Sequence, residues 1–163
     1  MEDEASLRAA HRELLSEGHD GFLLNDFSED EPDFKGFILR VTDYALGENL
    51  AEGHVPATFL VAVIDEEIVG RVSIRHELND FLLNFGGHIG YMVRPAFRRR
   101  GYATQMLRNA LKLANGFGLD RVLVTCDDDN VGSSKVIESQ GGVLENIVSH
   151  EGVRLRRYWI DNP

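Results

Sequence analysis

Cysteine is almost missing from this sequence, and long apolar runs are missing altogether. Cys126 is the only cysteine in 163 residues, so an internal disulfide and a thiolate-rich metal site are excluded. No run of about 18 apolar residues exists to span a membrane. Residues 1–10 are acidic and polar, without the apolar core of a signal peptide. These absences predict a soluble protein in a reducing, cytoplasmic setting, with no membrane partner.

Basic residues are scarce as well. The 17 Lys and Arg residues are outnumbered by 27 Asp and Glu residues, which gives a formal net charge of −10. An acidic surface repels phosphate backbones, so nucleic acid is not expected as a main partner. Hydrophobic residues at 43% and charged residues at 27% are ordinary values for a globular chain. The length suits one domain with a buried core.

The first third of the chain is predicted to be helical. Residues 4–16 have helical composition, with Leu7 and Leu14 among the apolar positions at helical spacing. The acidic stretch 19–33 is predicted to be a loop. Residues 34–47 carry a second amphipathic stripe that ends at a glycine.

The remainder alternates between strand and helix patterns. We predict strands over 58–64, 68–75, 88–93, 121–126, 143–148 and 153–160, and helices over 102–115 and 131–140. The first two strands form an antiparallel hairpin. The later strand–helix–strand order implies a right-handed crossover and a locally parallel pair. The fold class is therefore α/β, with a mixed sheet in a single domain over residues 1–163.

Residues 87–114 carry the most informative pattern. A strand runs into a loop with four arginines between Arg94 and Arg100, and the loop opens directly into a helix. Free N–H groups and the positive dipole end of a helix start make an anion site. Gly101 allows close backbone approach, because a Cβ there would crowd a bound phosphate. A diphosphate would account for the concentration of arginines in an otherwise acidic chain.

A simpler interpretation stays open for that loop. A basic stretch before a helix is often a solvated turn, and a lone glycine is often just a cap. The loop is also neither a Walker loop nor a dinucleotide fingerprint, because no Gly-Lys-Ser/Thr and no G-x-G-x-x-G occurs.

Three short motifs give the pattern a specific resemblance. Residues 98–103 (RRRGYA) resemble the (Gln/Arg)-x-x-Gly-x-(Gly/Ala) signature of the GNAT superfamily of N-acyltransferases. The strand before them ends in Val93-Arg94-Pro95, and residues 130–133 (NVGS) are similar to the family's Asn-x-x-Ser element. The resemblance covers residues 58–160, which it identifies as the sheet and the acyl-CoA-binding core. Residues 1–57 would be the variable helical part.

The resemblance implies a set of binding residues for acetyl-CoA, and it implies no metal. Backbone N–H groups of the signature loop would hold the pyrophosphate, the preceding strand would pair with the pantetheine arm, and the Asn-x-x-Ser element would lie near the thiol. Ser133 would contact the coenzyme or only brace its helix. The residues concerned are Tyr91, Met92, Val93, Arg98, Arg99, Arg100, Gly101, Tyr102, Ala103, Thr104, Asn130 and Ser133.

The implied reaction is direct attack of a neutral amine on the thioester. An alkylammonium with a pKa of about 10 must first lose a proton. His88 falls about where the family often has a glutamate, and an imidazole with a pKa of about 6.5 suits that task. The alternative is a structural histidine beside Gly86-Gly87. The family's usual tyrosine acid is replaced by Ile137, so the acid is unassigned.

Other features of the sequence allow further interpretations. The run Asp127-Asp128-Asp129 lacks the spacing of a calcium loop, and a solvated turn before a helix fits it better. The segment Val55–Thr58 is a candidate to line the acceptor cleft. The acceptor would be a small-molecule or peptide amine of unknown identity, and the oligomeric state stays open, a homodimer included. A coenzyme-binding sensor without catalysis and a nucleotide-binding protein are the alternative functions.

Overall fold

The computed structural model describes residues 3–18 and 33–163 of the chain. The loop predicted over 19–33 therefore lies outside the described residues, except for Asp33. The helices are α1 (Asp3–Ser16), α2 (Phe34–Leu46), α3 (Tyr102–Gly116) and α4 (Val131–Ser139). The strands are β1 (Ala57–Ile64), β2 (Glu67–Arg75), β3 (Ile89–Val93), β4 (Arg121–Asp127), β5 (Val143–His150) and β6 (Val153–Asp161). The element order predicted from the sequence is confirmed.

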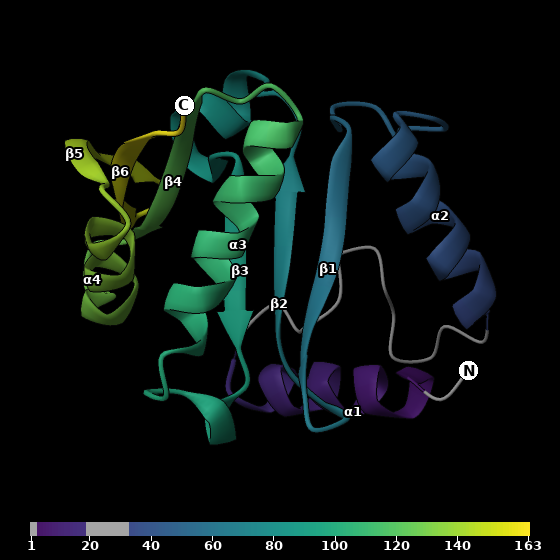
Figure 1. The fold of residues 1–163 in the computed structure, drawn as a ribbon. Coiled ribbons are helices and arrows are strands. Elements are labelled where there is room, and N and C mark those ends of the chain that lie inside the picture. Colours follow the sequence, from purple (N-terminus) through teal and green to yellow (C-terminus); the bar gives the residue numbers. More distant parts are fainter. Residues whose placement is uncertain (1–2, 19–32) are drawn as a thin grey trace.

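The first sheet has α3 on one face and the N-terminal helices on the other side. It has the order β1-β2-β3, and both pairs are antiparallel. Figure 1 shows α3 running along β2 and β3, while α2 stands beside β1. Side chains alternate along a strand, and the irregularity in the β1–β2 pairing between Ala62 and Val63 puts Ile68 out of step with Val72 and Ile74. Val72 and Ile74 pack with α3 in one core cluster, whereas Ile68 and Phe59 pack with α1 and α2 in a second.

The second sheet has the order β4-β6-β5, again antiparallel throughout. The crossover β3–α3–β4 occurs as predicted, but the expected parallel pair does not form a ladder. The backbone joins the two strands through the N–H of His88, which donates to the C=O of Leu123 over 2.7 Å. Gly87 makes this close approach feasible, since an added Cβ would lie 2.7 Å from the Leu123 oxygen. Beyond that junction the strands stay unpaired.

Two short elements were not anticipated, and one of them, the 3-10 turn η2 (Pro95–Phe97), lies in the arginine-rich loop. A short π-helical turn, η1 (Leu82–Gly86), fills what the sequence suggested was a loop before β3. Asn79 supports its start, because the Asn79 Oδ1 accepts from the N–H of Leu82 over 2.9 Å. None of the helices in the described residues has the length and apolar character needed to cross a membrane.

Candidate functional site

A cleft of about 670 Å³ opens where β3 and β4 part. Its walls come from β3, the loop before α3, the first turn of α3, the end of β4 and the start of α4. The lining residues are Tyr91, Met92, Val93, Phe97, Arg98, Arg99, Gly101, Tyr102, Ala103, Thr104, Asp127, Asn130, Gly132, Ser133 and Val136. All the binding residues implied by the sequence line this cleft, with one exception. Arg100 is not a lining residue, although its guanidinium carbon lies 5.5 Å from the centroid of the Phe97 ring, which does line the cleft.

The start of α3 presents free backbone donors to this cleft. Gly101 occupies the N-cap position with φ 83°, and no side chain caps the helix. The first helical hydrogen bond runs from the N–H of Gln105 to the C=O of Gly101. Within the described chain, the N–H groups from Arg99 to Thr104 therefore have no backbone acceptor. The N–H of Arg98, by contrast, donates to Pro95, so the donor set begins one residue later than predicted.

Gly101 also keeps the mouth of the cleft open. A Cβ added there would meet no described atom within 4 Å, so the protein leaves open space in front of this backbone. Its φ of 83° lies in the region that glycine enters without steric cost. Free N–H groups, the dipole of α3 and this open approach together fit a diphosphate.

The edge of β3 that faces the cleft is unpaired. The N–H of Arg94 donates to the C=O of Val69 over 2.9 Å, which fixes the direction of the backbone groups on the side of β2. Because these groups alternate along a strand, those of Tyr91 and Val93 point toward β4. Of these groups, the described part of the chain engages just the carbonyl of Val93, which accepts from the Nε of Arg98 over 3.2 Å. An extended ligand can therefore pair with this edge.

The arginine-rich loop has a second role that the sequence did not reveal. The Nε of Arg94 pairs with the carboxylate of Glu13 at 2.6 Å, and the Nη2 of Arg98 pairs with Glu17 at 2.8 Å. Both glutamates belong to the helix α1 or its end, more than 75 residues away in sequence. Two of the four arginines therefore attach the N-terminal helix to the sheet. Binding of a diphosphate is not needed to explain the presence of these two arginines in the loop.

The Asn-x-x-Ser element lies on the opposite wall of the cleft, at the start of α4. Asn130 is the N-cap of α4, because its Oδ1 accepts from the N–H of Ser133 over 3.0 Å. The carbonyl of Ser133 accepts from the hydroxyl of Tyr91 over 3.3 Å. Burial raises the pKa of Tyr91 to about 12. The phenol therefore stays protonated near neutral pH and keeps a hydrogen that it can donate.

His88 lies at the strand junction and lines neither this cleft nor the pocket described below. It is 6% exposed, and its Nδ1 accepts from the N–H of Leu123 over 2.9 Å. A backbone N–H can only donate, so the ring proton must sit on Nε2. Burial, helped by the charge of Arg75, lowers the pKa of His88 to about 4. This geometry gives His88 a structural task and does not favour the predicted role as base.

The acid remains unassigned at its usual place. Ile137 is fully buried and carries no proton to donate. The hydroxyl of Tyr158 donates to Glu138 over 3.0 Å, and burial raises the pKa of the Cys126 thiol to about 11. Three residues of β3 line the cleft, and Tyr91 is the one whose side chain has a proton to donate. No group of three His, Cys, Asp or Glu side chains in the described residues could hold a metal ion.

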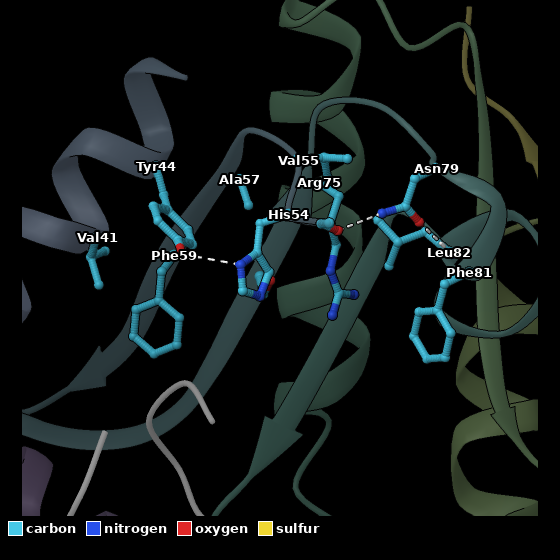
Figure 2. Close-up of a pocket in the computed structure, with 12 residues that line it drawn as sticks. Val41, Tyr44, His54, Val55, Ala57, Phe59, Arg75, Asn79, Phe81 and Leu82 are labelled. Atoms are coloured by element: carbon cyan, nitrogen blue, oxygen red, sulfur yellow. Dashed lines mark hydrogen bonds between the residues drawn. The ribbon is translucent and has the colours of Figure 1, made fainter. Parts of the chain in front are cut away.

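A second pocket, of about 360 Å³, lies on the side of α2 (Figure 2). It is formed by α2, the segment before β1, strands β1 and β2, and η1. The lining residues are Val41, Tyr44, Gly53, His54, Val55, Ala57, Phe59, Ser73, Arg75, Asn79, Phe81 and Leu82. The candidate segment Val55–Thr58 contributes two of them. No motif could have identified the others, since they are scattered over more than forty residues.

Comparisons with known proteins show a family match and similar folds. A family model of the acetyltransferase (GNAT) domain matches residues 26–143. Ribosomal-protein-S5-alanine acetyltransferase from Vibrio fischeri is similar in structure, with a TM-score of 0.72 and 18% identity over 98% of this chain and 88% of that one. No curated protein sequence gives a significant match.

Two further solved structures share the fold. An N-acetyltransferase from Staphylococcus aureus Mu50 has a TM-score of 0.68 and 15% identity, over 99% of this chain and 94% of that one. A proposed acetyltransferase from Salmonella typhimurium, solved with its cofactor acetyl-CoA, has a TM-score of 0.66 and 16% identity, over 99% and 91% of the two chains. Identities this low speak for a common fold and leave the acceptor open.

Proposed function

The chain belongs to the GNAT acetyltransferase family, and from that premise we propose that it moves the acetyl group of acetyl-CoA to a primary amine by direct attack. One observation carries the proposal. The uncapped start of α3 and the unpaired edge of β3 border the same cleft. The first offers donors for a diphosphate, and the second offers donors and acceptors for an extended amide chain.

Different residues of this cleft would bind different parts of the coenzyme. The N–H groups of Arg99–Thr104 would bind the diphosphate, with Arg99 adding positive charge. The backbone of Tyr91 and Val93 would bind the pantetheine arm. Asn130 supports this arrangement indirectly, because its side chain holds the first turn of α4 against the cleft. Acetyl-CoA supplies the acetyl group as a thioester, which an amine can attack without prior activation.

The proton of the amine needs an acceptor before or during the attack. His88 is poorly suited, because its lone pair is engaged with a backbone N–H. His54 is better suited. Its Nδ1 lies 3.2 Å from the hydroxyl of Tyr44, which can accept as well as donate. When Nδ1–H donates to that hydroxyl, Nε2 keeps a free lone pair. We assign the proton-accepting role to His54, directly or through a water.

The leaving sulfur needs a proton or a hydrogen bond. In the reaction an N–C bond forms and the C–S bond breaks, while the amine loses one proton and the sulfur gains one. The hydroxyl of Tyr91 is protonated at neutral pH and belongs to a residue of the strand that borders the cleft. Its hydrogen donates to the carbonyl of Ser133 over 3.3 Å and would rotate from there to the sulfur. We assign it the donor role that the position of Ile137 cannot fill.

The alternative is a sensor that binds the coenzyme without catalysing transfer, which the buried Ile137 would favour. Thiol release from acetyl-CoA with a panel of amines separates the two functions. Calorimetry with CoA is measured alongside. Heat of binding together with amine-dependent thiol release supports the acetyltransferase. Heat without release for any amine indicates the sensor, and no heat at all rejects both.

A further inference from the structure

The pocket beside α2 contains a positive charge for which residues 3–18 and 33–163 supply no partner. Arg75 ends β2 and its guanidinium extends into the middle of the pocket, between the rings of Phe59 and Phe81 in Figure 2. Among the described residues, no carboxylate, carbonyl or hydroxyl forms a hydrogen bond or ion pair with this guanidinium. The described lining residues include no Asp or Glu.

Three other arginines that are shielded from solvent each pair with a carboxylate. Arg94 pairs with Glu13 at 2.6 Å, Arg156 pairs with Asp128 at 2.7 Å, and Arg157 pairs with Glu145 at 2.6 Å. A charge taken out of water without a partner is costly. Burial lowers the pKa of Arg75, because removal from water disfavours the charged form of the guanidinium. An anionic ligand would supply the missing partner.

The unpaired charge lies against the strand that borders the coenzyme cleft. A Cβ added to Gly90 would lie 3.2 Å from the Nη1 of Arg75. Gly90 immediately precedes Tyr91, which lines the cleft on the other side of β3. The pocket and the cleft are therefore separated by a single strand at this point. A ligand anion on Arg75 would lie close to the region where an acceptor amine must approach.

The rest of the pocket is mostly apolar. Phe59, Phe81 and Leu82 line it together with Val41 and Val55. Its volume of about 360 Å³ is near the lower end of the range for small-molecule sites, which is roughly 300–1,000 Å³. The space therefore suits a compact molecule with an apolar part, and it is too small for a folded partner.

We propose that this pocket binds the acceptor, and that the acceptor is a free amino acid with an apolar side chain whose carboxylate pairs with Arg75. The planar guanidinium suits the two oxygens of a carboxylate. The α-amino group, one carbon from the carboxylate, then lies toward β3, and the side chain lies among Phe59, Phe81 and Leu82. This inference rests on the proposed acetyl transfer and names its substrate class.

The test compares amino acids with matched compounds that lack the carboxylate. Thiol release from acetyl-CoA is measured with alanine, valine, leucine, methionine and phenylalanine. Each is paired with its decarboxylated amine and its amino acid amide. At least one free amino acid is expected to show a kcat/KM about tenfold or more above both counterparts, as expected for losing a charged hydrogen bond. The amide arm also detects a peptide N-terminus as the true acceptor.

Three variants show whether Arg75 is the cause. Arg75→Gln should remove the preference for the carboxylate and leave turnover of the matched amine within about threefold. Arg75→Lys should restore part of the preference. Arg108→Gln, an exposed arginine outside both cavities, is the control and should behave like the original protein.

The outcomes separate this inference from the proposed function. CoA binding by calorimetry should be unchanged in all three variants. If CoA binds but no free amino acid exceeds its amine and amide counterparts, the inference is overturned while acetyl transfer can stand. Equal losses for acid and amine in Arg75→Gln would also overturn it, because they would indicate a purely structural role. Absence of CoA binding to the original protein would reject the proposed function instead.

Discussion

The cleft between β3 and β4 and the pocket beside α2 lie on opposite sides of one strand, yet they are built on different principles. The cleft uses backbone groups from two continuous segments, residues 91–104 and 127–136. The pocket uses side chains from scattered positions between Val41 and Leu82. A backbone site leaves a short motif in the sequence, because the turn and the glycine are local requirements. A side-chain site assembled by tertiary contacts leaves none, which is why only the fold exposes it.

The largest expected effect is a loss of CoA affinity from a substitution in the cleft that leaves the pocket beside α2 unchanged. Gly101→Val introduces a β-branched side chain at φ 83° and at the approach to the free N–H groups. Loss of about two charged hydrogen bonds predicts an affinity for CoA that is about 300-fold lower by calorimetry. Gly118→Val is the matched control, because Gly118 has φ 80° and equally open surroundings but lies outside the cleft. Both variants should lose similar stability, and an equal loss of CoA affinity would contradict the assignment.

His88, at the junction between β3 and β4, should make the free energy of unfolding depend on pH. Its pKa is lowered to about 4 in the folded state, against about 6.5 when unfolded. The unfolded chain therefore binds the extra proton between these values, and stability falls as the pH drops through that window. The loss at pH 4.5 would reach about 2.5 kcal/mol. Urea unfolding of the original protein and of His88→Gln at pH 7 and 4.5 measures it, and the variant should show a smaller decrease.

The same variant also tests the catalytic prediction for His88. If the histidine only joins β3 to β4, His88→Gln should keep amine-dependent turnover and its pH profile when assayed at a pH where it is folded. Abolished turnover with unchanged CoA affinity and unchanged unfolding would instead make His88 the base.

A smaller effect should distinguish chemistry from binding within the cleft. Tyr91→Phe removes the proposed donor to the sulfur and keeps the ring. We expect kcat to fall by about tenfold to a hundredfold, with CoA affinity unchanged. Tyr102→Phe, at another tyrosine of the same cleft wall, should leave kcat nearly unchanged. Equal rates in both variants would remove Tyr91 from the mechanism.

The smallest effect concerns Asn130. Because its side chain caps α4, Asn130→Ala should cost about 1 kcal/mol of stability and change CoA affinity less than about threefold. Thermal unfolding and calorimetry measure both quantities. Unchanged stability with a tenfold weaker coenzyme would mean that Asn130 contacts the ligand directly, as the resemblance first suggested.

The contrast between the two cavities also explains how far the sequence could be interpreted. The helix and strand periods predicted the element order, and the 98–103 motif predicted the cleft wall except for Arg100. The pairing of Arg94 and Arg98 with α1 was missed, because it joins segments that are distant in sequence. His88 was chosen as the base from its place in the chain, and the sequence could not show that its Nδ1 accepts from the N–H of Leu123. The unpaired charge of Arg75 became visible only when its surroundings were known.

The most direct test of the account is to observe the backbone amides themselves. In ¹H–¹⁵N spectra of the labelled protein, addition of CoA should shift the amide signals of Arg99–Thr104 and of Tyr91 and Val93 most strongly. The amides of Gly53 and Asn79, in the pocket beside α2, should move little. Shifts concentrated at Gly53 and Asn79, or absent from Arg99–Thr104, would contradict coenzyme binding at the start of α3.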